Sequence, residues 1–176
     1  MSSPELVTRI VKVGTTTNVS GKHKLTYHIG CNANSDIYFR VNENSGGGYF
    51  STEWVSLKAI QQAIEQGRKP TTSFALYTLF NGKSVNTPAF LLAALLKEGL
   101  VHMHEENQRC YAATNPGPFI TEINQLIASN INIQVEPNPK KKHKRLELFE
   151  AGPAIKKVSA RVAKRLAMQE ANKSKT

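Results

Sequence analysis

The chemistry that stands out in this chain is positive charge, concentrated near one end. Residues 139–176 contain twelve Lys or Arg and three Asp or Glu, whereas residues 1–138 contain eleven and ten. A basic segment on a nearly neutral body indicates a polyanionic partner, because each cation that neutralises a phosphate also releases counterions. The candidate nucleic-acid contacts in this segment are Lys140, Lys141, Lys142, Lys144, Arg145, Lys156, Lys157, Arg161, Lys164 and Arg165.

Two elements must present these charges. Residues 140–145 form a compact basic block, and residues 153–170 are predicted to form an amphipathic helix with a proline in its first turn. Pro137 and Pro139 favour an extended linker, so the sequence predicts a body over residues 1–138 and a basic tail over residues 139–176.

Residues 72–113 have the pattern of two helices followed by a hairpin. An apolar helix is predicted over residues 74–80, ending at an Asn-Gly break. A second helix is predicted to start with Thr87 as its N-cap and a proline at its first position, and to stop at Gly99. The apolar period then changes to two, which predicts paired strands within residues 100–113.

This order of elements resembles a winged helix-turn-helix, whose second helix enters the major groove of DNA. The resemblance implies body contacts from Lys83 and Arg109 to phosphate and from Asn86 and Thr87 near the bases. Residues 89–96 contain no Arg, Asn or Gln that could read base edges, so we expect mainly phosphate contacts. The same apolar helix is predicted to be buried in the body or against a partner, such as a second copy of the chain.

The sequence of the whole body predicts an α+β fold, with strands mainly over residues 5–55 and helices over residues 51–135. A short strand is expected over residues 6–13. Apolar residues alternate over residues 25–29 and 37–41, which predicts an antiparallel hairpin with one buried and one wetter face.

Three further elements complete the expected body. Ser51 is the candidate N-cap of a helix whose apolar stripe includes Trp54, which we interpret as a core residue. The glycine-rich loop before it lacks a phosphate-binding motif and is interpreted as a connection. A short amphipathic helix over residues 119–130 and a strand over residues 131–135 follow.

The sequence gives little indication of metal binding, catalysis or membrane insertion. His102, His104 and Cys110 could meet across the hairpin, but no fourth ligand has zinc-site spacing, so no metal site is predicted. Catalytic and cofactor-binding motifs are absent, so we expect a non-enzymatic protein without a cofactor. The sequence has no apolar run long enough for a membrane span, no secretory signal and only two cysteines, which favours a cytoplasmic protein.

The sequence therefore predicts a DNA-binding accessory or regulatory protein, for instance in transcription, that grips phosphates with its basic tail. RNA stays an alternative, because Tyr27, Tyr38 or Tyr49 could stack bases on a sheet. A second hypothesis is a protein–protein adaptor that docks through the apolar helix 89–96 or through the tail helix.

Overall fold

The computed structural model describes residues 7–80, 84–107 and 109–135. The chain divides into two units, residues 1–134 and residues 135–176. Only Val135 of the second unit is described, so all the described helices and strands belong to the first unit. The basic block, the expected tail helix and the expected boundary after residue 138 all lie outside the described residues.

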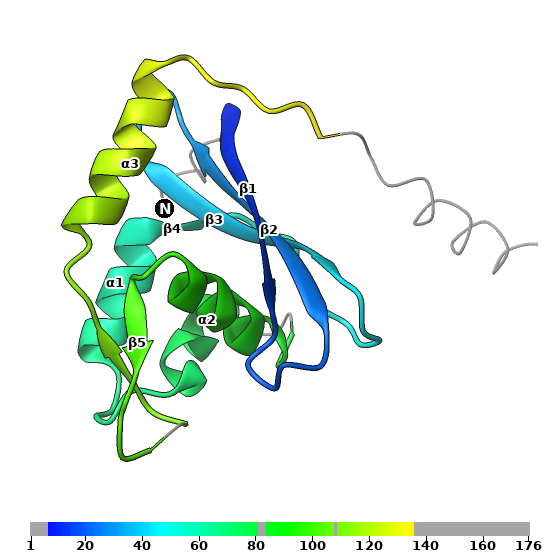
Figure 1. Ribbon diagram of the computed structural model, residues 1–176, viewed down its shortest axis with the longest axis vertical. Coiled ribbons are helices and arrows are strands. Elements are labelled where there is room, and N and C mark those ends of the chain that lie inside the picture. Colours follow the sequence, from blue (N-terminus) through cyan, green and yellow to red (C-terminus); the bar gives the residue numbers. More distant parts are fainter. Residues whose placement is uncertain (1–6, 81–83, 108, 136–176) are drawn as a thin grey trace, which may run out of the picture. The chain divides into compact units, whose positions relative to one another are not determined.

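An antiparallel sheet forms the N-terminal part of the first unit, as the alternating pattern predicts (Figure 1). Its strands follow one another in chain order, and a bulge at Val11 places both Val11 and Lys12 on the helix side. The strands are β1 (Arg9–Thr17), β2 (Lys24–Cys31), β3 (Ile37–Asn44) and β4 (Val55–Ser56).

Helices cover one face of this sheet, and a small hairpin lies between the last two described helices in the chain (Figure 1). The helices are α1 (Leu57–Gln66), the 3-10 helix η1 (Ser73–Phe80), α2 (Thr87–Lys97) and α3 (Gly117–Ala128). The hairpin pairs β5 (Val101–Met103) with β6 (Tyr111–Ala113). The expected α+β class is thus confirmed, and so are the two successive helical segments and the hairpin after them.

The core lies between the sheet and the helices. Ile29 and Phe39 from the sheet and Leu95 from α2 are fully buried there. The rings of Phe39 and Phe119 stack at 5.6 Å between centroids, which attaches α3 to the middle of the sheet. One apolar layer therefore holds all four helical segments in place.

Local signals located the end of α2 correctly but not the starts of the helices. Gly99 has φ of 71°, a left-handed conformation that favours glycine and ends α2 as predicted. The predicted cap at Thr87 is wrong, because Asn86 precedes the helix and Thr87 lies inside it. The predicted cap at Ser51 is also wrong, because Ser56 caps α1 by accepting a hydrogen bond from the Ala59 N–H.

Two further expectations need correction. Trp54 precedes β4 and so does not belong to the apolar stripe of α1. Residues 131–135 form no strand, although the Ile133 N–H donates to the Ile10 carbonyl at 2.8 Å beside β1. None of the helices in the described ranges is long and apolar enough to cross a membrane.

Candidate nucleic-acid interface

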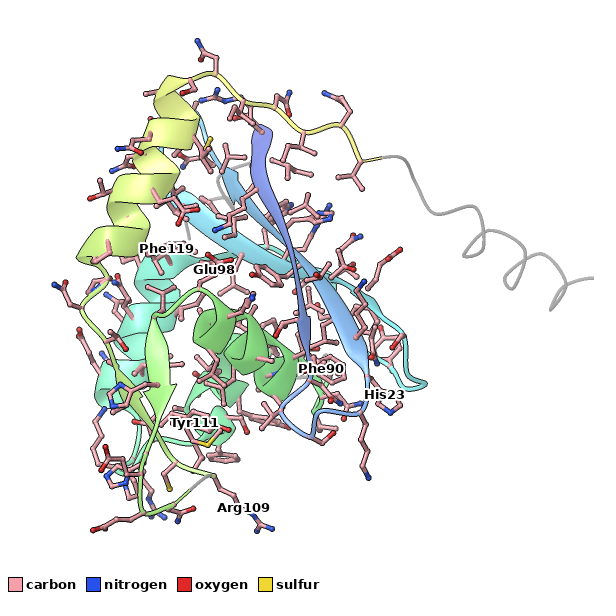
Figure 2. All side chains as sticks on the ribbon, in the orientation of Figure 1. His23, Phe90, Glu98, Arg109, Tyr111 and Phe119 are labelled. Carbon is pink, nitrogen blue, oxygen red and sulfur yellow. The ribbon has the colours of Figure 1, made fainter. Side chains whose placement is uncertain are left out.

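Of the predicted contact residues, the structure describes Asn86, Thr87 and Arg109. The others are outside the described residues, namely Lys83, Lys140, Lys141, Lys142, Lys144, Arg145, Lys156, Lys157, Arg161, Lys164 and Arg165. Arg109 is exposed beside the hairpin turn, and its side chain extends away from the fold (Figure 2).

Asn86 and Thr87 hold the start of α2 against the loop that precedes β4. The Thr87 hydroxyl accepts a hydrogen bond from the Ser51 N–H at 2.8 Å, and the Asn86 side-chain amide donates to the Tyr49 carbonyl at 3.0 Å. Ser84 donates to the same carbonyl at 2.9 Å. Thr87 is only 1% exposed, so its side chain has no surface left for a nucleic acid.

The helix in the position of a DNA-reading helix, α2, is enclosed by the rest of the unit. Leu91, Leu92, Ala93, Ala94 and Leu95 are all buried, and Lys97 is its only exposed residue. It packs against β1, β3 and η1. A helix enclosed in this way cannot enter a major groove, and residues 91–95 offer no free apolar face to a protein partner.

At the C-terminal end of α2, a buried carboxylate joins three elements (Figure 2). Glu98 accepts hydrogen bonds from the Tyr27 hydroxyl on β2 and from Lys12 Nζ on β1 at 2.9 Å. Lys12 also donates to Glu122 of α3 at 2.6 Å. Burial alone would lower the pKa of Lys12, but the two carboxylates outweigh it and raise that pKa. Burial and then Glu98 raise the pKa of Tyr27 as well.

The sheet face away from the helices carries a second polar cluster. His28 is fully buried there, although the alternating pattern predicts a wetter face. Arg40 donates to His28 Nδ1 at 2.9 Å and lies 4.6 Å from the centre of the Trp54 ring. Since arginine can only donate, His28 Nδ1 is the acceptor and Nε2 carries the proton. Burial, and then the charge of Arg40, lowers the pKa of His28 to about 4.

This cluster also contains buried nitrogen atoms without a partner. His28 Nε2 and Arg40 Nε find no hydrogen-bond partner among the described residues. Neither residue lines the small pocket or the larger groove described below. Tyr27, a candidate for base stacking, is 2% exposed and is excluded from that role by its burial, whereas Tyr49 is 77% exposed.

The hairpin does not bring its potential metal ligands together. His102 and His104 are exposed, whereas Cys110 is buried. Within residues 7–80, 84–107 and 109–135, no group of three or more His, Cys, Asp or Glu side chains could hold a metal ion.

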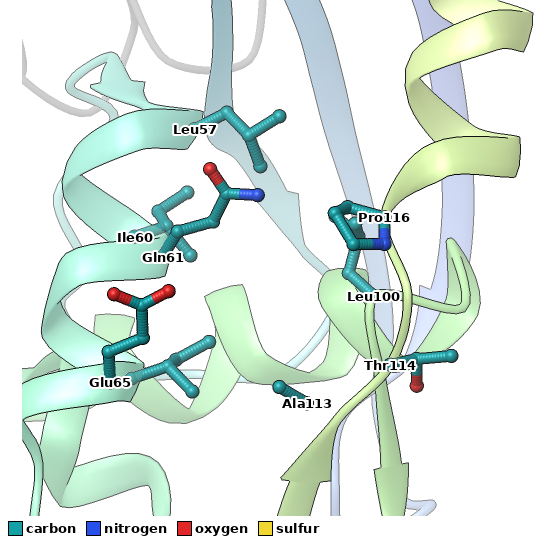
Figure 3. A pocket seen from close by; sticks show the side chains of 9 residues that line it. Leu57, Ile60, Gln61, Glu65, Leu100, Ala113, Thr114 and Pro116 are labelled. Carbon is teal, nitrogen blue, oxygen red and sulfur yellow. The ribbon is translucent and has the colours of Figure 1, made fainter.

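A small apolar pocket opens between α1 and the segment after β6 (Figure 3). Leu57, Ile60 and Leu100 line it, and Gln61 and Glu65 are the polar residues on its α1 side. Its volume of about 110 Å³ is below the several hundred Å³ of sites for small organic ligands. This pocket is therefore too small to bind a nucleotide.

A larger groove lies on the other side of α1, where the helix ends and η1 begins. Its volume is about 740 Å³, and Arg68, Lys69 and Phe74 line it. This basic and aromatic segment escaped sequence reasoning, which interpreted residues 74–80 as an apolar helix. The available signal was the Arg-Lys-Pro sequence at 68–70, followed after three polar residues by Phe74 and Tyr77.

The chain was compared with models of protein families, with curated proteins and with solved structures, and none of the three comparisons gave a match.

Proposed function

We propose that this protein binds nucleic acid, in the first place DNA, without catalysing a reaction, and that its basic tail supplies most of the affinity. The observation that carries the proposal is the charge distribution. Twelve of the 23 Lys and Arg residues lie in the last 38 residues, against three acidic ones. Phosphate contacts of this kind are independent of base sequence and give most of the affinity of non-specific binding.

The first unit supports this division of labour because it offers little positive surface of its own. Residues 1–138 hold eleven basic and ten acidic residues. One of these cations, Lys12, is already paired with Glu98 and Glu122. We infer that the unit provides shape and a few phosphate contacts, such as those of Arg109 and Lys83, while the tail provides the attraction.

We further propose that α1, η1, α2 and the β5–β6 hairpin form a winged-helix-like half. In this half, α2 has the position of the helix that reads DNA bases but does not perform that role. Support comes from the order of these elements and from the backbone of Thr71, which pairs with Tyr111 and so attaches the hairpin to the segment before η1. Because α2 is enclosed, binding through this half is expected to be insensitive to base sequence.

The test is a salt titration of the full-length protein on a random-sequence DNA duplex, followed by fluorescence anisotropy. With six to ten phosphate contacts, the affinity should fall about 10³–10⁵-fold between 50 and 200 mM salt. Replacing Lys140, Lys141 and Lys142 by Gln should make the slope of log affinity against log salt shallower by up to about 2.7.

A matched variant carries three Gln residues at exposed lysines of the first unit, Lys22, Lys24 and Lys58. It loses the same net charge, so it controls for a general effect of charge. The proposal requires the tail variant to be clearly weaker than this control. Equal affinities for the two variants, or a wild-type protein that does not bind the duplex, would refute it.

A further inference from the structure

The groove between α1 and η1 has the dimensions of a ligand site. Its volume of about 740 Å³ is within the range of sites for small organic ligands. The residues that matter for its chemistry are Ala63, Gly67, Arg68, Lys69, Phe74 and Ala75.

Small residues set how closely η1 approaches α1 in this groove. A methyl group added at Gly67 would lie 2.7 Å from the Ala75 Cβ and 3.0 Å from the Ala63 carbonyl oxygen. The backbones can therefore approach this closely only with glycine at position 67, and the groove depends on that approach for its shape.

An unusually exposed aromatic ring borders the groove. The ring of Phe74 lies parallel to that of Tyr77, with 5.5 Å between centroids and 9° between planes. Phe74 is nevertheless 75% exposed, although its burial would be favourable. Tyr77 covers one face of the ring, which leaves the opposite face free to stack on a planar ligand.

The charge beside this ring is positive and available. Arg68 is exposed, and within the described ranges it has neither an ion pair nor a hydrogen bond. Lys69 is held in place, since its Nζ donates to the Ile64 carbonyl at 2.8 Å and to the Thr71 hydroxyl at 3.2 Å. None of the described residues that line the groove is acidic, whereas Glu65 lines the small pocket on the other side of α1. An anionic ligand fits this lining.

We propose that the groove binds single-stranded nucleic acid, with a base stacked on Phe74 and a phosphate on Arg68. A free aromatic face and an unpaired guanidinium that line the same groove match the two chemical features of a nucleotide. A duplex cannot use the site in the same way, because its bases are already stacked on one another. That the ligand is a nucleic acid rests on the proposed function. The groove is a second binding site, distinct from the tail.

The test uses the full-length protein and a 12-nucleotide single strand, made as DNA and as RNA, with 2-aminopurine as a stacking reporter. The same DNA sequence as a duplex is the second probe. Replacing Phe74 by Leu keeps an apolar side chain but removes the ring. Stacking is worth roughly 1–3 kcal/mol per base, so this variant should bind the single strand about 5- to 150-fold more weakly. It should bind the duplex as the wild type does.

Further variants separate stacking from other effects. Phe74→Trp should restore the affinity and the quenching of 2-aminopurine, and Arg68→Gln should weaken single-strand binding and reduce its salt dependence. If Phe74→Leu binds the single strand as tightly as the wild type, the inference is wrong, and an apolar peptide becomes the better occupant.

The same measurements distinguish this failure from that of the proposed function. Tail neutralisation that weakens both probes, with no effect of Phe74→Leu, refutes the groove and leaves the function standing. A wild-type protein that binds neither probe refutes both. Comparison of the DNA and RNA strands identifies the preferred sugar.

Discussion

Two consecutive apolar helices of this protein, η1 and α2, differ sharply in what they expose. In α2, residues 91–95 are all buried and only Lys97 is exposed. In η1, Leu76 and Phe80 are buried, whereas Phe74 has three quarters of its surface in solvent. The helix that was expected to read DNA bases, α2, is thus part of the core. The helix before it, η1, is the one that presents an aromatic side chain to solvent.

The difference arises from the elements against which each helix packs. The sheet and η1 enclose α2, and the network around Glu98 anchors its end. η1 packs on α1 and α2 and leaves one side to solvent. Apolar composition therefore does not distinguish a core helix from one that offers a binding surface, because the neighbouring elements decide which side chains remain exposed.

The largest predicted effect is on α2. Leu95 is fully buried, so Leu95→Ala should lower the free energy of unfolding by about 2–5 kcal/mol. Lys97→Ala, two residues away on the exposed side, is the control and should change it by less than about 0.5 kcal/mol. Urea unfolding followed by circular dichroism measures both. If the two variants are equally stable, α2 is not a core helix.

These elements show what local patterns in the sequence predict well. The break at Gly99 and the alternation after it depend on residues a few positions apart, and both were predicted. The Thr87 hydroxyl was misassigned as a cap because it accepts the Ser51 N–H, 36 positions away in the chain, and the Ser51 hydroxyl accepts the Glu53 N–H before the helix begins. Local patterns carry no information about such a partner.

The candidate site was harder to predict for a related reason. The basic tail was evident from composition alone. The burial of His28 and the exposure of Phe74 depend on which elements cover them, and neither follows from the alternation of β2 or the apolar run of η1. Of the predicted body contacts, Arg109 is exposed as expected, whereas Thr87 is buried by the loop before β4.

The second prediction concerns the polar anchor of α2. Glu98→Gln removes the charge that Lys12 and Tyr27 contact and should lower the free energy of unfolding by about 1–3 kcal/mol. Glu122→Gln is the control, because the Glu122 side chain is 53% exposed and should matter less. Equal effects of the two substitutions would show that burial at Glu98 is unimportant.

The same network predicts an alkaline loss of stability. The pKa values of Lys12 and Tyr27 are raised in the folded protein, so above about pH 10 the folded state holds protons that the unfolded state releases. Their contribution is complete below that pH and is lost as the pH rises further. Urea unfolding between pH 8 and 11 should show this fall, and Glu98→Gln should make it shallower. A wild-type stability that does not change with pH over this range would contradict the prediction.

The fourth prediction tests how η1 is attached. In Gly67→Ala, the new methyl group would meet Ala75 at 2.7 Å, so the helices must separate, at a cost of about 1–3 kcal/mol. Gly47→Ala adds the same group in open space and is the control. The groove should also change shape, so Gly67→Ala should weaken single-strand binding. Unchanged stability in Gly67→Ala would mean that η1 can move away from α1 freely.

The smallest effect on stability is expected at the residue proposed to stack on a base. Phe74 is 75% exposed and its ring contacts Tyr77, so Phe74→Leu should change the free energy of unfolding by less than about 0.5 kcal/mol. Leu76, two residues on, is 1% exposed, and Leu76→Ala should cost about 2–5 kcal/mol. Thermal and urea unfolding of both variants decides the matter. If Phe74→Leu destabilises the protein as much as Leu76→Ala, Phe74 is a packing residue and η1 resembles α2 after all. If Phe74→Leu leaves stability unchanged while reducing single-strand affinity, the exposed ring is available for a ligand. No apolar side chain of α2 is exposed in this way.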